Sequence, residues 1–208
     1  AGMLAPGLAT MLVVITTDAV LDSAQLDRAL RTATRISFDR LDSDGCMSTN
    51  DQVSLLASGA SGISPDEALF TAALGDLCSD RAMQLQHDAE GASHDIIIEV
   101  MSAATEEDAV EVGRAIARNN LFKAAVFGND PNWGRVLAAV GTTQALFDPA
   151  ELDVSMNGVV VCRAGGVGED RSLVDLTARE VRVVVDLHAG STTATVWTND
   201  PGSYPHLP

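Results

Sequence analysis

The sequence predicts an α+β fold with layers of sheet inside and helices outside. Two groups of apolar, β-branched runs are typical of strands, and the segments between them carry apolar residues at helical spacing. The chain has 208 residues, of which 46% are hydrophobic, so it is long enough to bury one sizeable core. One domain is therefore the simplest expectation.

Two strands and two helices are expected in the N-terminal part. Residues 11–17 are a short run rich in β-branched side chains, which favours a strand. Residues 53–57 are a second short apolar run and are also expected to form a strand. Residues 23–38 place apolar side chains on one face at helical spacing. A second helix is expected to run from Ser64, which would cap it with a proline in the first position, to about His87.

One strand and two helices follow, and then strands alone. Residues 96–100 are a strand-like run, residues 105–118 open with an acidic helical turn, and residues 133–140 lie between a proline and a glycine. The last third contains three further strand-like runs, at 154–161, 181–187 and 193–198. The turn-forming residues between the last two runs predict a hairpin.

The charge of the chain excludes several classes of partner. Its formal net charge is −16, with 13 lysine and arginine residues, and Lys123 is its one lysine. Such a chain lacks the basic surface that binds nucleic acid or anionic lipid. It has neither an apolar run of about 20 residues, which a membrane-spanning helix needs, nor a positively charged signal region. We expect a soluble, cytoplasmic protein, and the missing initiator methionine suggests a piece of something longer.

The cysteines and histidines do not follow a metal-binding pattern. Cys46, Cys78 and Cys162 are widely spaced and odd in number, so buried free thiols are expected rather than disulfides or a zinc site. The four histidines show no HExxH spacing. We expect no metal and no bound cofactor.

A lone hydroxyl residue lies where the first loop enters the first strand. The loop GMLAPGLA ends at Ala9, and Thr10 precedes the apolar run. If the Ala9–Thr10 bond were cut, the new α-amino group, with a reference pKa of about 8, could accept the proton of the Thr10 hydroxyl and make it a nucleophile. Composition by itself favours an ordinary loop-to-strand junction instead.

Five motifs in order resemble the ornithine acetyltransferase family of arginine biosynthesis. They are GMLAPGLATML with the TTDA after it, DSDGCMSTND at 42–51, DAEG at 88–91, GNDPNWGRV at 128–136 and TND at 198–200. Several independent motifs in register over nearly the whole chain are far more specific than any one of them. The resemblance implies a four-layer αββα sandwich of the N-terminal-nucleophile-like type.

The resemblance also implies an activity. Members are made as a precursor that cleaves itself at the bond matching Ala9–Thr10, so residues 1–9 would end the α chain and residues 10–208 would be the β chain. Thr10 would attack the acetyl carbonyl of N2-acetylornithine, release ornithine and pass the acetyl group to glutamate in a ping-pong reaction. Bifunctional members also use acetyl-CoA as donor, and the chains assemble as an α2β2 heterotetramer.

Further site residues are carried over from the same resemblance. Glu90 matches a glutamate that contacts substrate, and a carboxylate suits the ornithine ammonium group; a solvated acid at a helix end is the alternative. Asp51, Asn132 and Arg135 are candidates for the pocket. A hydrogen-bonded loop around Asp51, and the capping and burial of a short helix around Asn132, are the alternatives.

Three departures leave other functions open. The family's oxyanion hole comes from an upstream Thr-Gly pair outside this chain, and a family lysine would lie just before Ala1. The tail after Asp200 does not match the family's substrate-contacting end. The alternatives are a related aminopeptidase-like hydrolase, in which water replaces glutamate as acceptor, and an inactive chain without its α partner.

Overall fold

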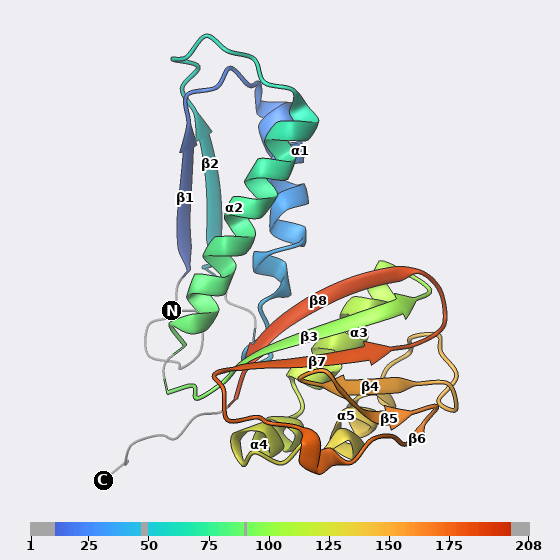
Figure 1. Ribbon diagram of the computed structural model, residues 1–208. Coiled ribbons are helices and arrows are strands. Elements are labelled where there is room, and N and C mark those ends of the chain that lie inside the picture. The colour runs from blue at the N-terminus through green and yellow to red at the C-terminus, as the bar shows by residue number, and fades with distance from the viewer. Residues whose placement is uncertain (1–10, 47–49, 90, 201–208) are drawn as a thin grey trace. The chain divides into compact units, whose positions relative to one another are not determined.

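The computed structural model describes residues 11–46, 50–89 and 91–200. The chain divides into two compact units: unit 1 comprises residues 1–41 and 46–88, and unit 2 comprises residues 42–45 and 89–208. Each unit has one sheet with helices on one of its faces (Figure 1). The prediction of an α+β fold is confirmed.

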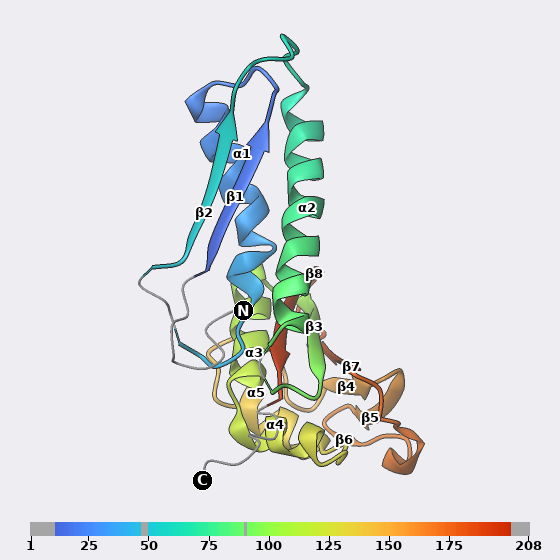
Figure 2. The ribbon, with the colours of Figure 1, turned by 90° about the vertical axis from the view of Figure 1, so that its left-hand side faces the viewer.

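Unit 1 is built on a two-stranded parallel sheet. Its strands are β1 (Leu12–Thr17) and β2 (Gln52–Ala57). Two helices, α1 (Ser23–Arg35) and α2 (Glu67–His87), lie on the same side of the strands in both views of the ribbon (Figures 1 and 2). The core between them contains alternate strand residues and one face of each helix: Val13, Ile15, Val53, Leu55, Ala33, Leu74 and Cys78.

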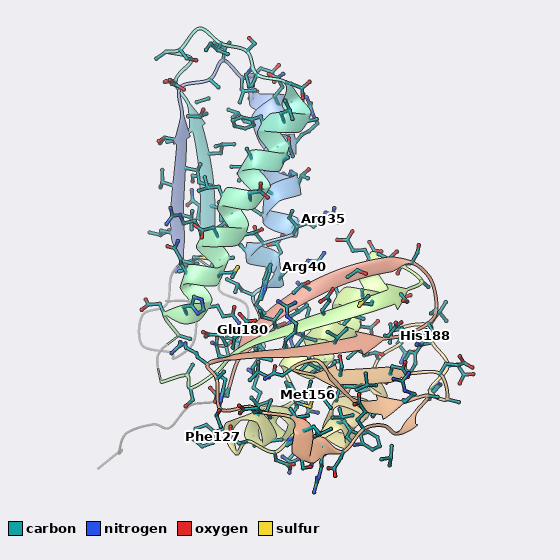
Figure 3. All side chains as sticks on the ribbon, viewed as in Figure 1. Arg35, Arg40, Phe127, Met156, Glu180 and His188 are labelled. Carbon is teal, nitrogen blue, oxygen red and sulfur yellow. The ribbon has the colours of Figure 1, made fainter. Side chains whose placement is uncertain are left out.

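Both helices of unit 1 begin with an aspartate cap. The Asp22 and Asp66 carboxylates accept hydrogen bonds from the first-turn N–H groups of α1 and α2. The predicted start of α2 at Ser64 is wrong, because Asp66 occupies the N-cap and the helix begins after it. α1 ends at Arg35, before its predicted end, since the chain then tightens into a separate 3₁₀ turn, η1 (Phe38–Arg40) (Figure 3).

Unit 2 is built on a six-stranded mixed sheet, with strand order β6-β5-β4-β7-β3-β8. Its strands are β3 (Asp95–Ala103), β4 (Asp153–Met156), β5 (Val159–Arg163), β6 (Gly166–Val167), β7 (Glu180–Asp186) and β8 (Thr192–Asn199). β3 pairs in parallel with β7 and antiparallel with β8. The helical elements are α3 (Glu106–Ala117), α4 (Asn120–Phe127), α5 (Trp133–Val140) and the 3₁₀ turn η2 (Arg171–Leu173).

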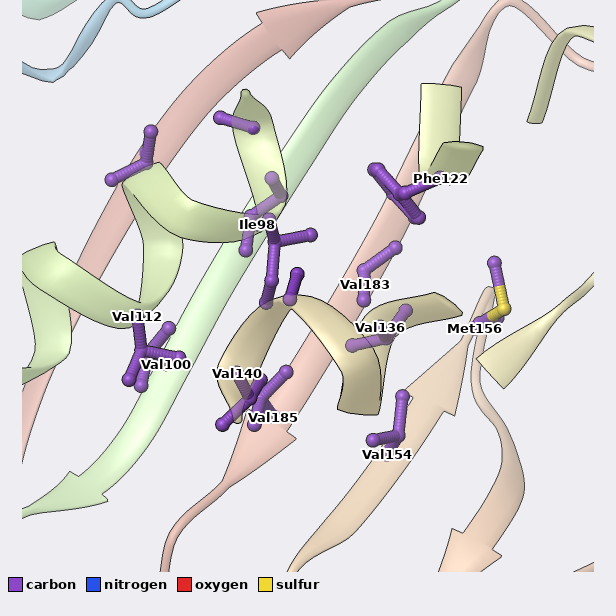
Figure 4. Packing of buried hydrophobic residues seen from close by; sticks show 14 of the residues in the cluster. Ile98, Val100, Val112, Phe122, Val136, Val140, Val154, Met156, Val183 and Val185 are labelled. Atoms are coloured by element: carbon purple, nitrogen blue, oxygen red, sulfur yellow. The ribbon is translucent and has the colours of Figure 1, made fainter. Parts of the chain in front are cut away.

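The core of unit 2 fills the space between the sheet and its helices. Figure 4 shows Val183 of β7 together with Phe122 of α4 and Val136 of α5, and all three side chains are fully buried. Gly113 lets α3 pack closely on β8, because a Cβ atom at this position would lie 2.7 Å from Val196 Cγ2. The close approach leaves no room for a side chain at position 113.

Three expectations about unit 2 are wrong. The predicted strand 154–161 is two strands, because Asn157 and Gly158 adopt positive φ angles of 46° and 87° and turn the chain between β4 and β5. β7 and β8 do not form a hairpin, since β3 lies between them in the sheet. Helix α4 was not expected: Asn119, predicted only to end α3, accepts a hydrogen bond from Phe122 N at 2.9 Å and so caps a new helix.

The cysteines differ in exposure. Cys78 and Cys162 are buried free thiols, as expected, and burial raises the pKa of both. Cys46 is exposed, so the expectation of burial is wrong for this residue. It lies in the polar loop that joins η1 to β2, which gives it no core to enter. In the part of the chain that the structure describes, no helix is long and apolar enough to cross a membrane.

Candidate active site

The residues expected to form the site fall into two groups. Ala9, Thr10 and Glu90 lie outside the described residues. Asp51 belongs to unit 1, whereas Asn132 and Arg135 belong to unit 2. The described parts of the candidate site are the residues next to Thr10 and the motifs carried by each unit.

The residue that follows Thr10 is held through both of its main-chain polar groups. The N–H of Met11 donates to Asp51 Oδ1 at 2.8 Å, and the carbonyl of Met11 accepts from Gln52 N at 2.8 Å. β1 and β2 continue from this point in parallel register, with Leu12 opposite Gln52. The strand that leads away from the Ala9–Thr10 bond is thus anchored at its first residues.

A cavity of about 380 Å³ lies beside this anchor in unit 1. Met11 and Asp51 line it from the strand side, and Leu30, Arg31 and Phe38 line it from the helical side. The cavity therefore combines apolar walls with charged groups, a lining suited to a small polar molecule.

The GNDPNWGRV motif forms the joint between α4 and α5 in unit 2. Arg135 Nη1 donates to the Leu121 carbonyl at 2.5 Å, and Asn132 Nδ2 donates to Asp130 Oδ2 at 3.0 Å. Trp133 packs against the core of unit 2. These contacts stabilise the joint between α4 and α5. A role of Asn132 or Arg135 in a substrate pocket stays a prediction.

Two other motifs meet in unit 2. Asp42, from DSDG, donates its N–H to the Trp197 carbonyl at 2.8 Å, and its carboxylate Oδ2 accepts from Arg118 Nε at 2.8 Å. Ser43 Oγ donates to Asn199 Oδ1 at 3.0 Å, which links DSDG to TND. Segment 42–45 is thus fixed against the end of β8 by side chains that the sequence placed far apart.

The profile of the ArgJ family matches residues 1–204. The chain belongs to the ArgJ family. The arginine biosynthesis bifunctional protein ArgJ of Streptomyces avermitilis is 67% identical to it over 200 residues, and the ArgJ protein of Bifidobacterium longum is 53% identical over 203 residues. Each comparison covers 96% of this chain, and the chain spans about half, 52%, of the length of each relative.

A solved structure of an ArgJ protein has the same fold. The crystal structure of the arginine biosynthesis bifunctional protein argJ from Bacillus halodurans matches this chain with a TM-score of 0.85 and 34% identity. The match covers 91% of this chain and 94% of the crystallised chain. It confirms the layered α+β sandwich that the family resemblance implied.

Lys123 was not expected among the notable residues of this ArgJ chain. It is 6% exposed, and its Nζ donates to the Ser43 carbonyl. Burial lowers its pKa to about 8, and the nearby carboxylates of Asp42, Asp44 and Asp200 offset part of this effect. The signal in the sequence was its position in LFKAAVF, where the one lysine of the chain interrupts an apolar helix.

A buried histidine in unit 2 was also missed. His94 is 6% exposed and lies between the carboxylate of Asp200 and the carbonyl of Leu176. Asp200 follows β8 directly and accepts the N–H groups of Ser93 and His94 at 2.7 and 3.0 Å. A histidine in the GASHD turn has no periodic neighbours, so no pattern in the sequence marks it as buried.

Proposed function

We propose that this chain carries the nucleophile of an ArgJ acetyltransferase, and that it transfers the acetyl group of N2-acetylornithine to glutamate through an ester on Thr10. The observation that carries the proposal is the match to the ArgJ family over residues 1–204, a range that includes Ala9, Thr10 and Glu90. The relatives named arginine biosynthesis bifunctional proteins support the same assignment.

The nucleophile is made by cleavage of the Ala9–Thr10 bond. In this proposal the Thr10 hydroxyl attacks the Ala9 carbonyl and the amide becomes an ester, with the acyl group moved from nitrogen to oxygen. Water then hydrolyses the ester, leaving a carboxylate on Ala9 and a free α-amino group on Thr10. That amine is the base that a weakly nucleophilic hydroxyl needs.

Acetyl transfer then proceeds in two balanced halves. The Thr10 hydroxyl attacks the acetyl carbonyl, its proton passes to the α-amino group, and ornithine leaves with that proton on its amine. The amine of glutamate attacks the acetyl ester next, the C–O bond breaks, and the Thr10 hydroxyl is restored. Glu90 would pair with the ornithine ammonium group. The reaction uses no metal or bound cofactor, and acetyl-CoA would enter as an alternative donor to the same hydroxyl.

An exposed apolar face of the sheet in unit 1 supports the proposal that a partner chain binds there. Leu12, Val14 and Leu56 lie on the side of the two strands away from the helices and are 70%, 66% and 56% exposed. Parallel sheets are almost always covered on both faces, and a two-stranded sheet is marginal by itself. We infer that the other half of the precursor, which the relatives contain, covers this face in a cytoplasmic α2β2 assembly.

An intact-mass measurement tests the proposal. The precursor that contains this chain is purified, and its mass is recorded before and after brief incubation with N2-acetylornithine. A fragment that begins at Thr10 and gains one acetyl group supports both the cleavage and the ester. An uncut chain without adduct overturns the proposal. Addition of glutamate then separates acetyl transfer, which yields N-acetylglutamate, from hydrolysis, which yields acetate.

A further inference from the structure

The hydrogen bond between Met11 and Asp51 differs from the rest of the β1–β2 ladder. Gln52 N donates to the Met11 carbonyl, as a parallel ladder requires, and β2 begins at Gln52. One step further, the acceptor for the Met11 N–H is the side-chain carboxylate of Asp51, not a main-chain carbonyl. The loop therefore ends the ladder with a charged acceptor at the residue next to Thr10.

The position of this acceptor matters because of covalent geometry. The nitrogen that Asp51 holds at 2.8 Å is the nitrogen of the Thr10–Met11 peptide bond. A peptide unit is planar and includes the nitrogen, the N–H hydrogen and the Cα of Met11, so holding these three atoms fixes its plane. The hydrogen bond to Asp51 holds the N–H, and the pairing of the Met11 carbonyl with Gln52 holds the Cα. One planar group therefore connects Asp51 to the residue that precedes Met11 in the chain.

We propose that Asp51 is a positioning residue for Thr10, which orients the hydroxyl through the Thr10–Met11 peptide unit. The inference rests on the proposed function, because it assigns Asp51 to the cleavage of the Ala9–Thr10 bond and to the acylation of Thr10. Asp51 takes no proton from the reacting atoms. It acts through Met11, and a charged acceptor strengthens the bond to that N–H.

The alternative for Asp51 is a purely electrostatic part in the cavity of unit 1. Asp27 lines the same cavity and is a carboxylate as well, but it is paired with Arg31 at 2.9 Å. Substitution of Asp27 changes the charge of the cavity and leaves the Met11 anchor in place. Asp27→Asn is therefore the matched control.

Four variants of the full precursor test the inference: Asp51→Ala, Asp51→Asn, Asp51→Glu and Asp27→Asn. The rate of Ala9–Thr10 cleavage is followed by intact mass after synthesis, and the acylation rate is measured on the cleaved fraction over a range of N2-acetylornithine concentrations. Misplacement of a reacting group by about 1 Å costs about 100-fold. We expect Asp51→Ala and Asp51→Glu to slow both steps by about 10- to 100-fold, with little change in KM.

The neutral variants separate position from charge. Asp51→Asn keeps an oxygen at the same place, so we expect it to stay within about fivefold of the wild type, as Asp27→Asn should. If Asp51→Ala does not fold by circular dichroism, the Asn and Glu variants decide. Asp51→Asn as slow as Asp51→Glu, or Asp51→Ala as fast as wild type, overturns the inference. A wild-type precursor that neither cleaves nor acylates would instead refute the proposed function.

Discussion

His94 Nδ1 and Asp200 Oδ2 lie 2.7 Å apart in the buried part of unit 2. The other ring nitrogen, Nε2, lies 3.0 Å from the Leu176 carbonyl. The ring thus lies between a carboxylate and a carbonyl, which are both hydrogen-bond acceptors. Asp200, the residue after β8, is therefore held in the buried part of unit 2 by the His94 ring as well as by the N–H groups of Ser93 and His94.

Removal of the ring should destabilise the chain strongly. His94→Ala removes the ring that lies 2.7 Å from the buried Asp200 Oδ2, and leaving a buried acceptor without this partner costs about 2 to 3 kcal/mol. His188→Ala is the control, because the His188 side chain is 42% exposed and its ring lies 3.3 Å from Asp153, so the loss should stay below about 1 kcal/mol. Urea unfolding followed by tryptophan fluorescence measures both. Equal losses would contradict a stabilising role for the buried contact between His94 and Asp200.

The lowered pKa of Lys123 makes stability depend on alkaline pH. Its pKa falls from 10.5 to about 8 on folding, so between these values the unfolded chain binds the proton more tightly than the native one. The contribution of Lys123 to the unfolding free energy therefore rises as the pH increases through this range. Wild type should gain stability relative to Lys123→Met between pH 8 and 10, because the buried thiols titrate equally in both. A constant difference in urea midpoints would contradict this.

Close packing at Gly113 predicts sensitivity to a single methyl group. Gly113→Ala would bring Cβ to 2.7 Å from Val196 Cγ2, and overpacking of this kind costs about 1 to 3 kcal/mol. Gly134→Ala in α5 has only the Asn132 side chain nearby, at 3.4 Å, so helix propensity should make it neutral or stabilising by up to about 1 kcal/mol. Thermal unfolding of the two variants compares them. A tolerated alanine at position 113 would mean that α3 can move away from β8.

The proposed assembly predicts that charge on the open face of unit 1 weakens the association of the two halves of the proposed precursor. Val14→Asp places a carboxylate on that face, whereas Val167→Asp makes the same change on β6 of unit 2, where the side chain is 81% exposed. We expect a dissociation constant raised by about 100-fold or more for Val14→Asp and near wild type for the control, since an unpaired buried charge costs several kcal/mol. Analytical ultracentrifugation of the cleaved complex measures it. Intact assembly of Val14→Asp would show that another surface binds the partner.

Periodicity predicted the existence and type of most elements. The observed α3 lies within the predicted 105–118, and α5 coincides with 133–140, because each carries clear cap or breaker residues at its ends. The strands β1, β2 and β3 were also expected. Their apolar runs have the length of strands and are too short for a typical helix. α4 was missed because its two capping residues were interpreted differently: Asn119 as the end of the preceding helix, and Gly128 as part of the GNDPNWGRV motif.

Strand pairing could not be predicted from local signals. The turn between β7 and β8 contains residues typical of a hairpin, yet β3 lies between the two strands in the sheet. No residue near His188 or Ser191 indicates that a strand so distant in sequence would pair there. The turn at Asn157 and Gly158 was different. Its Asn-Gly pair is a strong hairpin signal, which the continuous apolar run on both sides obscured.

The candidate site depended more on resemblance than on physical reasoning. Composition favoured an ordinary loop before β1, and only the set of motifs pointed to Thr10. The hydrogen bond between Met11 and Asp51 could not be predicted from the sequence, because it joins the last residue of a loop to the residue before a distant strand. Contacts of this kind depend on register, which the sequence does not encode locally.

The place of β3 between β7 and β8 also has a consequence for synthesis. A ribosome releases β3 long before either of its neighbours exists, since Asp95 pairs with Glu180 on one side and Asn199 on the other. Both edges of the strand stay open until β7 and β8 have been synthesised, and such edges can pair with other chains. The sheet closes last, after slow, long-range contacts form. Chaperone protection during translation would therefore matter most for the central strand, long before Asp200 meets His94.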